Sequence, residues 1–147
     1  AIPVILALLE DHSMDLTGWA VACVLFNIIG CREGADIAIK AGACAPLVRL
    51  LAAGIPAATQ EAAAGALNRL AMYAEDTQAM MDAGAVPALL RVLGPHGACP
   101  DVQRWASLVL NNLLHYHPSS KSHMIAVGAI PLLVQLLRPE TARPIYI

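Results

Sequence analysis

The chain has 147 residues, which suits a single domain; 58% of them are hydrophobic and 14% are charged. The net charge is -2, and no basic run that would track phosphates occurs, so a nucleic-acid partner is not expected. The four cysteines, at positions 23, 31, 44 and 99, form no CxxC pair, which argues against a disulfide framework and favours a reducing, cytoplasmic location.

The first long apolar run is WAVACVLFNIIG, from Trp19 to Gly30. The charge-free window around it extends from Leu16 to Cys31 and holds 16 residues. A membrane span needs about 20 predominantly apolar residues. The segment before it, AIPVILALLEDH, lacks the basic n-region and the cleavage pattern of a signal peptide. We therefore predict that the apolar run is a helix that is buried nearly all round between neighbouring helices.

One ten-residue element recurs along the chain. It begins at Gly42 as GACAPLVRLL, at Gly84 as GAVPALLRVL and at Gly128 as GAIPLLVQLL, with spacings of 42 and 44 residues. The chain start, AIPVILALL, is the same element without its glycine. Self-similarity at a period of this size indicates stacked structural repeats.

Each unit is expected to contain three helices. A short first helix ends over residues 36–41, and Gly42 supplies the left-handed turn after it. The third helix is long and rich in small residues, and it extends over residues 57–73 in the second unit. The second helix begins with a proline near its first position, where a missing N–H costs nothing. The prolines are Pro3, Pro87 and Pro131, with Pro46 displaced by one residue.

The segments GAVPALLRVL, GAIPLLVQLL and EAAAGALNRLA, with their period, resemble the armadillo repeat family. The resemblance implies an all-α fold: a right-handed armadillo-type α-solenoid of about three and a half repeats, with three helices per repeat. The units are approximately 1–41, 42–83 and 84–127, with a partial unit at 128–138. A non-helical tail is expected over 139–147, because two prolines interrupt it.

The first helix, IPVILALL, does not have the polar outer face that a terminal repeat needs. We therefore expect either that more repeats precede residue 1 or that another protein covers this end. The chain is accordingly expected to be part of a larger complex or of a longer chain.

The resemblance also suggests binding residues. In armadillo proteins the third helices line a concave groove, and groove asparagines in importin alpha and beta-catenin bind the backbone of an extended peptide. Asn27 and Asn112 fall at that position, whereas Arg69 takes it in the middle unit, so the row of asparagines is broken. The alternative is that Asn27 and Asn112 satisfy backbone groups between helices.

Two tryptophans, Trp19 and Trp105, lie about two turns before Asn27 and Asn112. They are expected either to pack between repeats or to anchor a partner. Importin alpha has its tryptophan one turn before the groove asparagine. The residues at that place here are Cys23, Gly65 and Leu108, which argues against nuclear-signal binding of that type.

Charged residues complete the candidate groove. Arg69 is expected to bind an acidic residue of a partner or to pair with Glu61 or Asp101. Glu61 and Arg104 are expected near the edge of the groove.

No enzyme motif occurs: GxSxG, HExxH and the P-loop are all missing from the sequence, so no catalytic residue is proposed. His115, His117 and His123 lie close together, but no acidic or cysteine ligand has a standard spacing and Pro118 intervenes. We predict a solvated loop there, with no metal and no cofactor.

These observations predict a non-enzymatic interaction scaffold or structural subunit that binds a protein or extended peptide through its groove, its exposed ends or both. Cytoskeletal or axonemal assemblies are compatible with this function. Two alternatives stay open: a peptide-binding adaptor or transport receptor, and the substrate-recognition part of a larger enzyme such as an armadillo-containing ubiquitin ligase.

Overall fold

A computed structural model describes residues 2–11, 16–94 and 98–137 and shows an all-α protein, with no strand among those residues. The predicted tail 139–147 lies outside the described residues, as do residues 95–97 of the loop before the last long helix. The helices are α1 (Ile2–Asp11), α2 (Leu16–Ile28), α3 (Arg32–Lys40), α4 (Cys44–Arg49), α5 (Ala57–Tyr73), α6 (Gln78–Asp82), α7 (Ala85–Leu93), α8 (Pro100–Tyr116), α9 (Ser120–Ala126) and α10 (Ala129–Leu136). Within the described part of the chain, none of them is both long and apolar enough to cross a bilayer.

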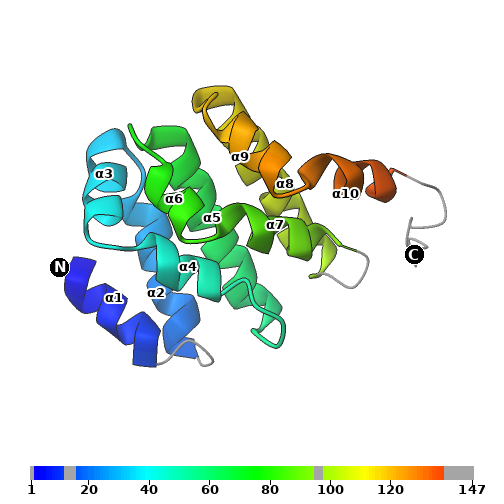
Figure 1. Ribbon diagram of the computed structural model, residues 1–147. Coiled ribbons are helices and arrows are strands. Elements are labelled where there is room, and N and C mark those ends of the chain that lie inside the picture. Colours follow the sequence, from blue (N-terminus) through cyan, green and yellow to red (C-terminus); the bar gives the residue numbers. More distant parts are fainter. Residues whose placement is uncertain (1, 12–15, 95–97, 138–147) are drawn as a thin grey trace.

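The helices form two main layers (Figure 1). The long helix α5 packs between α2 and α8, and α1, α4, α7 and α10 form a second layer that lies in front of them in this view. The short helices α3, α6 and α9 lie along one edge. The order short, short, long therefore occurs twice in full, as α3–α4–α5 and as α6–α7–α8.

The recurring glycines make the turns between the short helices. Gly42, Gly84 and Gly128 have φ values of +84°, +79° and +75°, a region that side chains disfavour, as predicted for Gly42. At the first of these turns the Gly42 N–H donates to the Ile39 carbonyl and the Ala43 N–H donates to the Ala38 carbonyl. This pair of bonds is a Schellman motif, which ends α3 and redirects the chain into α4.

In three of the units, the proline of the recurring element lies two residues beyond the first helical position, near which it was predicted. Pro46, Pro87 and Pro131 are each the third residue of their helix, because the helix begins directly after the turn. The N–H groups of the first helical turn have no partner within the helix, so proline costs no hydrogen bond at this position either. The additional residue in the second unit is Ala43, which extends the turn and leaves Pro46 in the common place.

The core is built around α5, whose bounds agree with the predicted range 57–73. Ala63, Ala64, Ala66 and Leu67 are fully buried, and the small side chains let α2 and α8 approach from both sides. The side-chain amide of Gln60 donates to the Ala52 carbonyl and holds the loop before α5 in place. The side-chain amide of Gln103 on α8 donates to the Val92 carbonyl of α7.

The prediction that the apolar run 19–30 is buried nearly all round is wrong. One side of α2, with Val21 and Leu25, is buried against the core, as is Ile29 directly after the helix. Trp19 and Val24 are exposed. The reason is that α2 is the first long helix of the described chain and packs against α1, α3 and α5, whereas α5 has a long helix on each side.

Candidate functional site

The candidate residues lie on the layer formed by the three long helices. Trp19, Cys23 and Asn27 follow one another at four-residue spacing on α2, which places them on one helix face. The same spacing relates the residues 61, 65 and 69 on α5 and the residues 104, 108 and 112 on α8. Because the three helices pack side by side, these rows form one continuous surface.

A hollow of about 320 Å³ opens on this surface between α2 and α5. It is lined by Trp19, Cys23, Phe26, Asn27, Ala58, Glu61, Ala62, Gly65 and Trp105. Four of the seven predicted groove residues, Trp19, Asn27, Glu61 and Trp105, therefore belong to one site. Most of the remaining lining is apolar, which suits a hydrophobic side chain of a partner.

Gly65 creates the floor of the hollow. A Cβ atom at this position would lie 3.1 Å from the Phe26 ring and 3.9 Å from Trp105, so the missing side chain is the space that both rings use. The two rings meet edge to face across α5, with centroids 6.2 Å apart and an interplanar angle of 79°. Trp105 is half-buried.

Arg69 and Asn112 are both engaged with the preceding long helix. The Arg69 guanidinium lies 3.9 Å above the Phe26 ring, which is a cation–π contact. The Asn112 amide donates to the side-chain oxygen of Asn68 at 2.8 Å. Each contact joins one long helix to the next at the same level of the layer, so these side chains help to hold the helices in register.

The predicted ion pairs of Arg69 are not present among the described residues. Its guanidinium lies over Phe26, and Asp101 instead accepts a hydrogen bond from Arg104 at 2.8 Å in an exposed i,i+3 pair on α8. The pairing within α8 is favoured because both residues lie on one helix face.

Asn27 differs from Asn112, because its amide donates to the Cys23 carbonyl in its own helix at 3.0 Å. The residue is exposed and is one of those that line the hollow. Among the described residues, neither asparagine bonds a backbone group of another helix, which was the alternative considered from the sequence. Asn27 thus keeps an acceptor for a partner, whereas Asn112 is used within the protein.

Glu61 gives the hollow its charge. The residue is exposed on the rim, and no hydrogen bond or ion pair of its carboxylate occurs within the described ranges. Trp19, on the opposite rim, is 43% exposed. A carboxylate and two partly open indole rings around an apolar floor can hold an aliphatic or aromatic side chain whose polar end is cationic.

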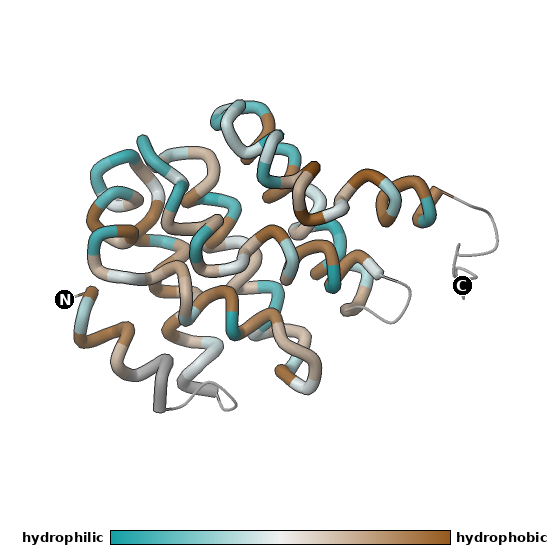
Figure 2. The backbone as a smooth tube through the Cα atoms, viewed as in Figure 1, coloured by the Kyte–Doolittle hydropathy of each residue, from teal (hydrophilic) through white to brown (hydrophobic). Residues whose placement is uncertain are grey.

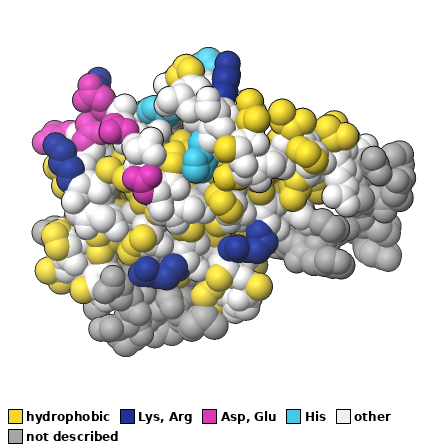
Figure 3. All heavy atoms as spheres, in the orientation of Figure 1, with side chains coloured by type: hydrophobic (Ala, Val, Ile, Leu, Met, Phe, Trp, Pro, Cys, Tyr) yellow, Lys and Arg dark blue, Asp and Glu magenta, His cyan; other side chains and the backbone are white. Residues whose placement is uncertain are grey.

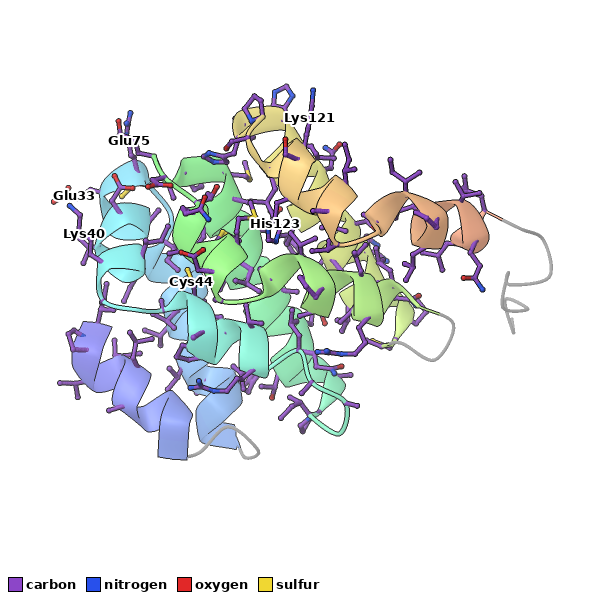
Figure 4. The ribbon with its side chains drawn as sticks, in the orientation of Figure 1. Glu33, Lys40, Cys44, Glu75, Lys121 and His123 are labelled. Carbon is purple, nitrogen blue, oxygen red and sulfur yellow. The ribbon has the colours of Figure 1, made fainter. Side chains whose placement is uncertain are left out.

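The thiols near the site are not activated nucleophiles. Burial raises the pKa of the Cys23 thiol above its ordinary value of 9.0, and burial raises the pKa of the Cys44 thiol to about 11. Both thiols therefore stay protonated at neutral pH, and a protonated thiol is a poor nucleophile. Cys44 lies at the start of α4 (Figure 4) and is not among the residues that line the hollow. All four cysteines are free.

The histidine segment is more ordered than the predicted loop. His115 lies in the last turn of α8 and His123 lies in α9, so only His117, next to Pro118, is outside a helix. The His117 ring nitrogen lies 3.1 Å from the Ala71 carbonyl and ties the end of α8 to α5. Within the described residues, no three histidine, cysteine or acidic side chains are grouped closely enough to hold a metal.

Another hollow, of about 350 Å³, is lined by residues that include Leu51, Gly54, Gln60 and Arg91. The Gln60 amide that faces it is already bonded to the Ala52 carbonyl. We therefore place no site there.

Sequence reasoning missed Phe26, Gly65 and Asn68 as parts of this surface. Gly65 stood out only as a departure from the importin alpha pattern, and Phe26 is the single phenylalanine of the chain. A glycine within a run of alanines on a long helix is the signal that another side chain approaches closely there. A comparison of the sequence with models of protein families finds no match.

Proposed function

We propose that this protein is a non-enzymatic interaction scaffold of the armadillo-type α-solenoid class, which holds a segment of another protein on the surface formed by α2, α5 and α8. The proposal includes the right-handed stacking that the armadillo resemblance implies and the repeat units inferred from the sequence period. It also includes a reducing, intracellular setting, which the four free thiols favour.

The observation that carries the proposal is the aromatic hollow at Trp19, Phe26 and Trp105 with the Glu61 carboxylate on its rim. Interface anchors are enriched in large aromatic side chains that seat in desolvated pockets. A hollow of about 320 Å³ is at the lower end of the range for ligand sites and matches one large side chain of a protein segment.

The contacts of Arg69 and Asn112 favour the scaffold function over the transport receptor. A receptor of that type requires free amides that bind a peptide backbone at successive levels. Here the Asn112 amide is bonded to Asn68, and Arg69 at the equivalent place lies over Phe26. Specificity therefore comes from a partner side chain that binds in the hollow, and not from asparagine amides that bind the partner's backbone at successive levels.

The test places a large side chain at the rim of the hollow, where it occupies the space that a partner side chain would use. Ala57 and Ala58 are adjacent and exposed at the start of α5, but only Ala58 lines the hollow. We would select binders from a displayed library of random peptides and then compare the wild type with Ala58→Trp and with Ala57→Trp. We expect the affinity of the selected peptides to fall at least about tenfold in Ala58→Trp, because the indole occupies their anchor site.

Ala57→Trp is the matched control and should bind the selected peptides as the wild type does. The proposal fails if no peptide is selected, or if Ala58→Trp and Ala57→Trp bind equally well. Thermal melting of both variants would establish that each is folded.

A further inference from the structure

The hollow between α2 and α5 is lined by aromatic rings from two helices that flank α5. Trp19 and Phe26 come from α2, and Trp105 comes from α8 and reaches across α5 to Phe26. The two tryptophans of the chain are therefore both in this lining. Because the Phe26 and Trp105 rings stand at 79° to each other, they meet as a corner and not as a flat stack. The hollow is thus bounded by ring surfaces on more than one side.

Small residues of α5 leave room between these rings. Ala58, Ala62 and Gly65 line the hollow, and their spacing of four and three residues places them on one side of the helix. Figure 2 shows much of α5 in the pale colours of weakly hydrophobic residues. None of the three has a side chain larger than a methyl group. A group that enters between the rings therefore meets methyl groups and helix backbone at the floor.

The charge of the hollow comes from Glu61, whose carboxylate has no partner among the described residues. Among the described residues that line the hollow, Glu61 alone is charged. Figure 3 shows acidic side chains gathered elsewhere, at the corner formed by α3 and the segment after α5. There the Glu75 carboxylate lies 2.6 Å from the Arg32 guanidinium. A positively charged ligand would give Glu61 the kind of partner that Glu75 has.

A cationic group fits this hollow better than a neutral one. A side chain that enters the hollow removes water from the Glu61 carboxylate, which costs free energy unless an opposite charge compensates for it. The face of an aromatic ring attracts cations, and indole does so more strongly than phenyl. The carboxylate and the two indole rings therefore favour the same charge.

The available hydrogen-bond acceptors decide which cation fits. A lysine ammonium has three donors and an arginine guanidinium has five, and these donors need acceptors once they leave water. Among the side chains that line the hollow, only those of Asn27 and Glu61 carry an acceptor oxygen. The Cys23 carbonyl already accepts the Asn27 amide. A fully methylated ammonium keeps its charge and has no donor, so it matches a lining that is poor in acceptors.

Arg69 leaves this hollow to a ligand. Its guanidinium lies 3.9 Å from the centroid of the Phe26 ring, and Arg69 is not among the residues that line the hollow. A Cβ atom at Gly30 would lie 3.1 Å from Nη1 of Arg69, so the guanidinium is near the residues that follow α2. Trp19 is near the start of that helix. The internal cation is thus on Phe26, and the tryptophans are left for a cation of the ligand.

We propose that the hollow binds the side chain of a trimethylated lysine, with its quaternary ammonium against the indole rings of Trp19 and Trp105 and opposite the Glu61 carboxylate. The inference rests on the proposed function, because it names the side chain that a bound segment places in the hollow. No unmodified side chain carries a quaternary ammonium. Methylation of the partner therefore controls the interaction.

The experiment compares peptides that differ in one group. Synthetic libraries with random, tryptophan-free flanks carry one of three central residues: trimethyllysine, lysine, or the neutral isostere of trimethyllysine, in which a tert-butyl group replaces the trimethylammonium group. Each selected binder is remade with the other two central residues. Quenching of the tryptophan fluorescence measures the affinity, because both tryptophans line the hollow. We expect trimethyllysine peptides to bind at least about fivefold more tightly than either other form.

Variants of the chain separate charge from shape. Glu61→Gln should weaken binding of the trimethyllysine peptide about twofold to fivefold and leave the neutral isostere unaffected. Glu33→Gln is the matched control: it removes an exposed carboxylate of α3 outside the lining and should change neither affinity. Trp19→Leu keeps an apolar side chain but removes a ring, so the preference for trimethyllysine over the isostere should fall at least about twofold. Thermal melting establishes that each variant is folded.

Three results would overturn the inference. The first is that lysine or the isostere binds as tightly as trimethyllysine and that the affinity is still lost in Ala58→Trp; the proposed function would then stand without this inference. The second is that choline alone binds as tightly as the trimethyllysine peptide, which would assign the hollow to a free quaternary ammonium compound. The third is that none of the three libraries yields a binder, in which case the proposed function fails as well.

Discussion

The helices α7 and α10 make the most informative comparison in this molecule. They share one sequence element, begin with the same left-handed glycine turn and carry proline as their third residue. Yet the apolar side chains of α7 are buried and most of those of α10 are exposed. The sequence element therefore identifies side chains that are suited to burial, while the presence of a long neighbouring helix decides whether burial occurs.

The test with the largest expected effect compares Leu89 in α7 with Leu133 in α10, which are each the fifth residue of their helix. Leu89→Ala in α7 should lower the free energy of unfolding by about 3 kcal/mol, because it leaves a cavity in a covered layer. Leu133→Ala in α10 should cost less than about 1 kcal/mol, since this side chain is already partly hydrated. Urea denaturation of both variants measures the two values. Equal losses would mean that the two environments do not differ as described.

The second test concerns the first residue of α4, α7 and α10, which is buried in each of these helices. Cys44, Ala85 and Ala129 each begin their helix and are each buried. The pKa of the Cys44 thiol rises to about 11 in the folded protein, so the unfolded chain loses its thiol proton first as the pH rises. Above pH 9 the unfolded state binds fewer protons, and the stability of the wild type should fall by about 2 kcal/mol by pH 11 from this thiol.

Cys44→Ala provides the control, because alanine is the residue that α7 and α10 have at this place. The stability difference between wild type and Cys44→Ala should be constant below pH 9 and should shift against the wild type between pH 9 and 11. Denaturant titrations at several pH values measure the difference. An unchanged difference across this window would show that the thiol is not shielded from water.

The third test compares the same groove position in the covered and the open long helix. Gly65→Leu on α5 should destabilise the protein by about 2 kcal/mol, because a side chain there meets the Phe26 ring and overpacks the layer. Leu108→Ala on α8 should cost less than about 1 kcal/mol, because Leu108 is exposed. Tryptophan fluorescence should also change in Gly65→Leu as Trp105 is displaced. A neutral Gly65→Leu would mean that the rings move aside without cost.

The smallest expected effect concerns the amide pair. Asn68→Ala and Asn112→Ala should each cost about 1 kcal/mol, and the double variant should cost no more than about the larger single loss. Asn111→Ala should leave the stability of the isolated chain unchanged, because its side chain has no partner in the described structure. Additive losses for Asn68 and Asn112 would show that the two residues do not act as a pair.

Much of the fold was predictable from local chemistry. The glycine at position 42 predicted a left-handed turn and has one, and the range predicted for the third helix of the second unit agrees with α5. These features depend on residues close in sequence: a glycine that tolerates positive φ, a run of small helix-forming residues, and a proline that is acceptable only in a first helical turn.

The candidate surface was predictable only in part. The period placed Asn27, Arg69 and Asn112 at equivalent positions on the three long helices, and Trp19, Glu61 and Trp105 do line one hollow. The partners of those residues were not predictable, because a contact such as Asn112 to Asn68 depends on the offset between two helices. The same offset places Arg69 over Phe26 instead of beside an acidic residue.

The sequence by itself determined which segments are helical, where the chain turns and which side chains are suited to a core, because these follow from backbone preferences and from the repeated apolar pattern. Tertiary structure alone decided which of those side chains are covered. The long helix α5 has a long helix on both sides and is buried, α2 and α8 each keep an open side, and α10 keeps an apolar face exposed. The physical reason is that the hydrophobic effect acts on surface removed from water, and that surface is defined by neighbours in space rather than in sequence.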